Sequence, residues 1–175
     1  KKMRPKNFDE LGMMIALFRP GPMDSIKSYS NREHGKENIS YYVDSLKPVL
    51  GSTYGIIIYQ EQVNQIAQVM AGFSMAEADM FRRAVSKKKK EEMEQLKGSF
   101  IDGCIKNGYS EKVSNEVYDL INKFANYGFN KSHSVVYSIL ACRMAYLKAH
   151  YPLEFYATFF SVRSKQYDIE TMIKG

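Results

Sequence analysis

Two short segments of the sequence concentrate side chains that could bind phosphate. The first, Asn130–Ser134, lies within Gly128–Pro152 and comes just before a long expected helix. The N-terminus of a helix presents backbone N–H groups without intrahelical acceptors and the positive end of the helix dipole. The side chains of Lys131, Ser132 and His133 can also donate hydrogen bonds to phosphate oxygens. The segment therefore predicts an anion site, although it lacks the GxxxxGK[ST] spacing of a Walker loop.

Three residues of this segment also have a simpler explanation. Ser132 and Ser134 alone are more readily explained as ordinary helix caps. His133 alone fits a structural histidine that is hydrogen-bonded to backbone. These simpler explanations are harder to apply to all five positions together, because Asn130 and Lys131 adjoin the serines and the histidine.

The second segment is Glu77–Lys90, which carries Arg82 and Arg83 followed by the lysine run Lys87–Lys90. Adjacent helical residues point about 100° apart, so the two arginines are not expected to enter the core together. The lysine run, which includes Lys88 and Lys89, is expected to form an exposed cationic loop. Arginine suits the geometry of phosphate oxygens, and lysine supplies a mobile charge. The alternative is a cationic face that contacts only solvent.

Two further stretches carry polar groups of interest. Arg19, in the sequence FRPGP, is a candidate anion contact, although a turn arginine facing solvent explains it equally well. Tyr59, Gln60 and Glu61 follow an apolar run, and they fit buried polar contacts as well as ligand contacts.

Composition limits the classes of function. The 175 residues suffice for one sizeable domain or two small ones, and the net charge of +6 favours acidic partners. Cys104 and Cys142 lack the spacing of a zinc site and fit a cytosolic protein better than a secreted one. No apolar run is long enough to span a bilayer, and no pair of aspartates suggests a two-metal site. The absence of an initial methionine predicts a part of a longer polypeptide.

The hydrophobic periodicity predicts a mainly α fold with at most a short strand near Ile56–Ile58. Asp9 is the expected cap of the first helix, and Gly72 is expected to end the helix that starts at Gln60. The capping residues and apolar faces predict helices over Asp9–Arg19, Gln60–Ala71, Ser74 onward, Glu91–Asn107, Ser110–Phe124, Ser134–His150 and Pro152–Phe160.

Five motifs, in order and over nearly the whole chain, resemble the alpha subunit of bacterial DNA polymerase III, a C-family replicative polymerase. They are ALFRPGPM (Ala16–Met23), TYGIIIYQEQV (Thr53–Val63), GFSMAEADMFRRAVSKKK (Gly72–Lys89), GFNKSHSVVYS (Gly128–Ser138) and AYLKAHYPLEF (Ala145–Phe155). The resemblance implies that residues 1–163 form the fingers domain. The apolar pattern thins near Ser164, so a linker or a further helix is expected over residues 164–175.

The resemblance also implies a function. The parent would be a cytoplasmic DNA-directed DNA polymerase, a nucleotidyltransferase of DNA replication, whose fingers bind the incoming dNTP and primer-template DNA. The catalytic residues and Mg²⁺ would belong to the palm, so this chain alone would hold no metal or cofactor and would be inactive. Its other partners would be the palm, the remaining domains and replisome subunits, with no membrane.

The resemblance assigns roles to particular positions. The residues implied to bind the triphosphate are Arg82, Arg83, Lys87, Lys131, Ser132 and His133. Those implied to make secondary or nucleic-acid contacts are Arg19, Lys88, Lys89, Asn130 and Ser134. Two other interpretations stay open: a non-enzymatic helical module that binds the DNA backbone, and a helical protein-interaction domain whose basic face is only solvated.

Overall fold

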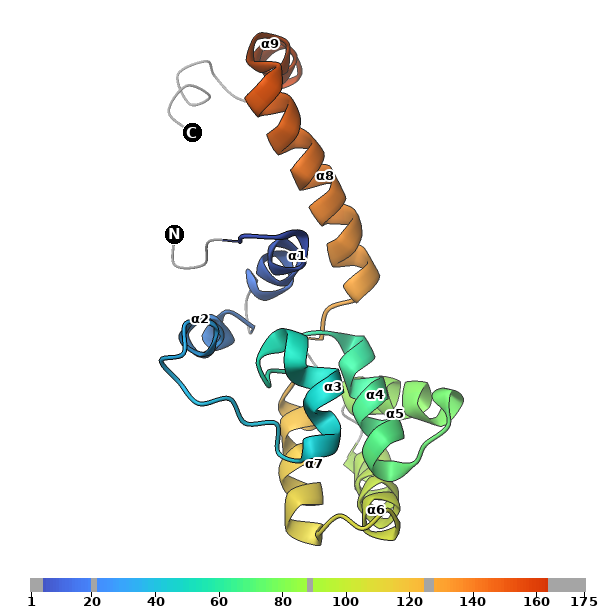
Figure 1. The fold of residues 1–175 in the computed structure, drawn as a ribbon. Helices are drawn as coiled ribbons and strands as arrows, with labels where there is room; N and C mark the ends of the chain where they lie inside the picture. Colours follow the sequence, from blue (N-terminus) through green and yellow to red (C-terminus); the bar gives the residue numbers. More distant parts are fainter. Residues whose placement is uncertain (1–4, 20–21, 88–89, 125–127, 164–175) are drawn as a thin grey trace. The chain divides into compact units, whose positions relative to one another are not determined.

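The computed structural model describes residues 5–19, 22–87, 90–124 and 128–163, and most of these are helical (Figure 1). The mainly α prediction is confirmed. Within the described residues, Ile56–Ile58 forms no strand, and Tyr59 and Phe129 make an isolated parallel bridge.

The elements in chain order are α1 (Phe8–Leu17), η1 (Pro22–Ser25), α2 (Ile26–Glu33), η2 (Asp44–Leu46), α3 (Lys47–Leu50), η3 (Gly51–Thr53), α4 (Gln60–Ala71), α5 (Met75–Lys87), α6 (Lys90–Lys106), α7 (Glu111–Phe124), α8 (Lys131–His150) and α9 (Pro152–Arg163).

The chain divides into two compact units, Lys1–Val135 and Val136–Gly175. The first unit contains α1 to α7 and the first turn of α8, and the second contains the rest of α8 with α9. All the residues implied to bind a triphosphate therefore belong to the first unit. No described helix has the length and apolar character needed to cross a membrane.

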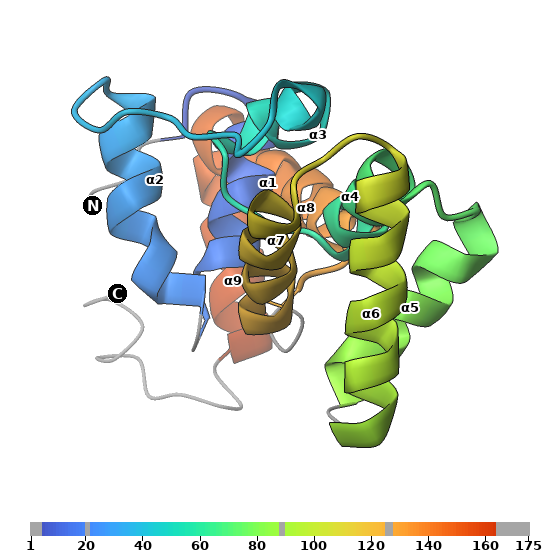
Figure 2. The same cartoon turned by 90° about the horizontal axis from the view of Figure 1, so that it is seen from below.

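The core of the first unit is built around α4, which packs against α5 and α6, while α7 packs on α6 (Figure 2). The apolar face predicted for α4 is confirmed, since Val63, Ile66 and Met70 are fully buried. Across it, the rings of Phe81 and Phe100 stack with centroids 5.3 Å apart. This stack anchors α5, which carries the two arginines, against the core.

Local sequence signals set the ends of α4 and α5. Gly72 ends α4 with φ 71°, a left-handed conformation that glycine adopts without steric cost. Ser74 and Glu77 form the expected reciprocal cap of α5: the Ser74 N–H donates to Glu77 Oε2 (2.8 Å) and the Glu77 N–H donates to Ser74 Oγ (3.3 Å). The predicted cap of this helix is therefore confirmed.

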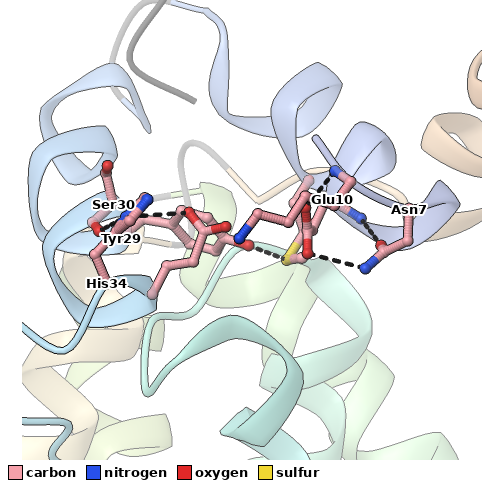
Figure 3. A network of polar contacts seen from close by, with 8 residues as sticks. Asn7, Glu10, Tyr29, Ser30 and His34 are labelled. Carbon is pink, nitrogen blue, oxygen red and sulfur yellow. Dashed lines mark hydrogen bonds and ion pairs between the residues drawn. The ribbon is translucent and has the colours of Figure 1, made fainter. Parts of the chain in front are cut away.

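Helix α1 begins earlier than predicted, and the choice of Asp9 as its cap was wrong. Asn7 caps the helix, because its Oδ1 accepts from the Glu10 N–H (2.9 Å) while its Nδ2 donates to Glu10 Oε1 (2.9 Å) (Figure 3). The Tyr29 hydroxyl of α2 reaches back to Met13 Sδ of α1 at 3.3 Å. This contact joins α1 and α2 in a second small core.

The lysine-rich segment also differs from expectation. Lys87 is the last residue of α5 and Lys90 is the first residue of α6, so both belong to helices rather than to an exposed loop. Lys88 and Lys89 lie outside the described residues.

Candidate anion-binding site

Gln60, the first residue of α4, joins the two cationic segments. Its side-chain Oε1 accepts a hydrogen bond from Arg82 Nη1 (3.2 Å), and its Nε2 donates to the carbonyl oxygen of Gly128 (3.1 Å). Its backbone N–H donates to the Phe129 carbonyl oxygen (2.9 Å). One glutamine therefore connects α5 to the segment that leads into α8, although these parts are about fifty residues apart in the sequence.

Asp79 organises the arginine pair. Arg82 Nη2 donates to Asp79 Oδ1 (2.6 Å), and Arg83 Nε donates to Asp79 Oδ2 (2.8 Å). These contacts span three and four residues of α5, the spacings at which helical side chains meet. The hydrogen bond from Arg82 lowers the pKa of Asp79, so the carboxylate stays ionised at neutral pH. The side chain of Arg82 is 18% exposed and that of Arg83 is 68% exposed.

Helix α8 begins at Lys131, three residues before the predicted start at Ser134. The reason is Asn130, whose Oδ1 accepts from the His133 N–H at 3.0 Å and so acts as the N-terminal cap. The N–H of Lys131 donates to both carboxylate oxygens of Glu61, at 3.0 and 3.1 Å. Ser134 is buried, and its hydroxyl donates to the Lys131 carbonyl oxygen (2.9 Å).

Aromatic rings support the cations beside this helix start. The guanidinium carbon of Arg19 lies 4.5 Å from the centre of the Phe129 ring, and that ring meets the His133 ring edge-to-face at 5.2 Å. Lys131 Nζ lies 5.8 Å from the centre of the Tyr59 ring. Burial lowers the pKa of Arg19 and raises the pKa of the Tyr59 hydroxyl, so Tyr59 stays neutral.

The structure thus brings several of the implied residues toward one region. Arg82 and the start of α8 share Gln60, Arg19 reaches the same helix start through Phe129, and Arg83 follows Arg82 through Asp79. Ser132 is exposed in the first turn of α8. For Lys87 the structure describes the backbone alone, and Lys88 and Lys89 fall outside the described residues. Ligand binding by these residues stays a prediction.

Two residues of the site went unnoticed in the sequence. Asp79 stands three and four positions before the arginines, and this spacing could have identified it as their partner. Phe129 had no local signal, because its contacts with Arg19 and Tyr59 join distant parts of the chain. The ambiguous prediction for Gln60 and Glu61 resolves into hydrogen bonds within the protein.

The arrangement is suited to holding a polyanion. It combines guanidinium groups, a lysine and a helix N-terminus, which all donate hydrogen bonds or carry positive charge. Within the described residues, no group of three or more His, Cys, Asp or Glu side chains could hold a metal ion.

Comparison with known proteins identifies the family. Residues 1–108 match the model of the bacterial DNA polymerase III alpha subunit finger domain. The chain is 52% identical over 155 residues to DNA polymerase III subunit alpha of Bacillus subtilis, an alignment that covers 89% of this chain and 14% of that protein. It is 49% identical over 164 residues to the Escherichia coli K12 subunit, and 47% identical over 159 residues to that of Aquifex aeolicus. Each of these alignments covers 90% of this chain and 14% of the relative, so the chain spans about one seventh of the proteins that it matches. The chain therefore belongs to the family of bacterial DNA polymerase III alpha subunits, within which its first 108 residues match the finger domain.

Proposed function

We propose that the surface formed by Arg82, Arg83 and the first turn of α8 binds the triphosphate of an incoming dNTP during template-directed DNA synthesis. The observation that carries this proposal is Gln60, which contacts both Arg82 and the segment before α8. A nucleoside triphosphate carries about three to four negative charges. A single helix N-terminus carries about half a positive charge, so it cannot offset them alone. Arginines beside the start of α8 would add the positive charge that the helix N-terminus lacks.

The chemistry of the proposed step is phosphoryl transfer. The primer 3′-hydroxyl attacks the α-phosphate of the nucleotide, and pyrophosphate leaves. The arginines and Lys131 would hold the β- and γ-phosphate oxygens, so that the reacting groups are aligned and the charge on the leaving group is neutralised. Ser132 and His133 would donate from the exposed first turn of α8.

In this proposal, the metal-binding catalytic residues lie outside the described residues of this chain. Mg²⁺ would be held by acidic residues of the palm, since the described residues provide no suitable cluster. The chain by itself is expected to extend no primer in the presence of Mg²⁺ and dNTPs. Primer extension by the rigorously purified chain would contradict this part of the proposal.

The proposal is tested by single-nucleotide incorporation kinetics in the full-length alpha subunit that carries this segment. Arg82→Ala or Arg83→Ala should weaken transition-state stabilisation by about 1.5–3 kcal/mol each, the range for hydrogen bonds to charged groups. This corresponds to a loss of about tenfold to 150-fold in kcat/KM. Lys131→Ala should cost a similar or smaller amount, because lysine acts as a point charge.

The matched control is Lys112→Ala, which removes one exposed positive charge from α7. Its kinetics should stay close to those of the unsubstituted enzyme, and the melting temperatures of the Lys112, Lys131 and Arg83 variants should change little. Unchanged nucleotide kinetics in all three site variants would refute triphosphate binding here. A uniform loss of duplex affinity with a reduced salt slope, without any nucleotide effect, would favour a DNA-backbone site instead.

A further inference from the structure

We propose that Asp79 and Glu61 act as internal substitutes for phosphate, holding the donors of the anion site until a nucleotide displaces them. The inference rests on the proposed triphosphate site and adds a positioning and specificity role for two carboxylates within it.

Asp79 takes one donor from each arginine. Its Oδ1 lies 2.6 Å from Arg82 Nη2 and its Oδ2 lies 2.8 Å from Arg83 Nε. One carboxylate thus spans two guanidinium groups, as two oxygens of a phosphate would. The side chains of Asp79 and Arg83 are 34% and 68% exposed, so solvent reaches this ion pair.

Glu61 plays the corresponding part at α8. Its carboxylate comes from the first turn of α4, a different helix, and both of its oxygens accept from the Lys131 N–H, at 3.0 and 3.1 Å. Lys131 is the first residue of α8, so this N–H belongs to the group that a helix leaves without intrahelical acceptors. A phosphate bound at a helix N-terminus uses the same kind of donor.

The two carboxylates therefore engage both halves of the proposed site. Neither arginine can give the same N–H to a carboxylate and to a phosphate at full strength. A triphosphate has more charge and more acceptor oxygens than a single carboxylate, so it can displace them, whereas a monoanion gains little by the exchange. The carboxylates would also favour the release of pyrophosphate, because they can again accept the hydrogen bonds from the arginines and from the Lys131 N–H that pyrophosphate had accepted.

A purely structural role for Asp79 makes the opposite prediction. If the carboxylate stays in place and only orients the arginines toward the nucleotide, then its removal leaves them less ordered and weakens nucleotide binding. If Asp79 competes with phosphate, its removal strengthens nucleotide binding. The sign of the change in affinity therefore separates the two roles.

The experiment measures the Kd of the next correct dNTP for the full-length alpha subunit on a primer-template with a dideoxy-terminated primer. Asp79→Asn and Glu61→Gln should each lower this Kd by about threefold to tenfold, the range for losing one or two surface ion pairs. Pyrophosphate should also inhibit these variants at lower concentrations. The control is Asp102→Asn, which removes the same charge from an exposed position on α6 and should leave the Kd within about twofold.

A second substitution tests whether Asp79 acts through the arginines. In an Arg83→Ala background, Asp79→Asn should give a smaller gain, since one of its partners is absent. If Arg82→Ala and Arg83→Ala both leave the dNTP Kd unchanged, the proposed site itself is refuted. If they weaken binding while Asp79→Asn and Glu61→Gln leave it unchanged or weaken it too, the site stands and the displacement role is wrong.

Discussion

Gln62 offers the sharpest test of how the fold supports the candidate site. Its side chain is buried in the first turn of α4 and makes four hydrogen bonds. Oε1 accepts from the backbone N–H groups of Ile58 (2.8 Å) and Tyr59 (3.0 Å). Nε2 donates to the Val49 carbonyl oxygen (3.1 Å) and to Thr53 Oγ1 (2.8 Å). The residue thus fixes the backbone that enters α4, next to Gln60.

The substitution Gln62→Met keeps a similar volume and removes all four hydrogen bonds. Ile58 and Tyr59 are 1% and 5% exposed, so their N–H groups lose an acceptor where water cannot readily replace it. Each unsatisfied buried polar group costs about 1–3 kcal/mol, so the two together predict a loss of about 2–6 kcal/mol. That is a large part of the total of about 5–15 kcal/mol that stabilises a typical domain.

The assay is urea unfolding of the chain, followed by circular dichroism at 222 nm. Gln65→Met serves as the control, because Gln65 is exposed on the same helix and its substitution should change the free energy of unfolding by less than about 0.5 kcal/mol. A loss below about 1 kcal/mol for Gln62→Met would show that these hydrogen bonds do not hold the start of α4 in place.

Two further predictions follow from packing and burial. A Cβ on Gly103 would overlap the Ala71 carbonyl oxygen and lie 3.0 Å from the Ala71 Cβ, so Gly103→Ala should destabilise the α4–α6 contact by about 1–3 kcal/mol in urea unfolding. Gly98→Ala, on the same helix in open space, should instead stabilise by about 0.5–1 kcal/mol, and equal effects of the two would contradict this explanation. Burial raises the pKa of the Cys104 thiol to about 11, so a thiol reagent at pH 8 should rapidly modify only exposed Cys142, and Cys142→Ser should abolish that fast phase.

The sequence predicted well what depends on neighbouring residues. Gly72 ends α4 and Ser74 caps α5 as expected, because each acts on backbone groups within a few residues. The start of α8 was misplaced because several adjacent residues could cap it, and Asn130, rather than a serine, accepts the N–H that decides the boundary. The cap of α1 failed for the same reason, since Asn7 and Asp9 are both suitable residue types.

The arrangement of the candidate site could be anticipated only in part. The arginines and the start of α8 carried a chemical signal in the sequence, but the contacts that bring them together involve Gln60 and Phe129, which are about seventy residues apart. Periodicity and capping rules describe one helix at a time, so they contain no information about such a pairing. The family resemblance implied that the two segments converge on one anion site. The structure shows hydrogen bonds from Gln60 to both segments, and anion binding there stays a prediction.

The first turn of α4 explains why this site and the core depend on each other. Gln62 turns inward and holds the backbone before the helix, while Gln60 contacts the arginine of α5 and the segment before α8, and Glu61 reaches the first N–H of α8. Three consecutive polar side chains thus make separate contacts: Gln62 contacts the core, whereas Gln60 and Glu61 contact the candidate site. Substitutions at Gln62 should appear first as lost stability, whereas those at Glu61 should appear first as changed nucleotide affinity. These contacts hold the candidate site on helices that pack against the core, and in the proposed function this arrangement would limit the reorganisation that the reaction requires.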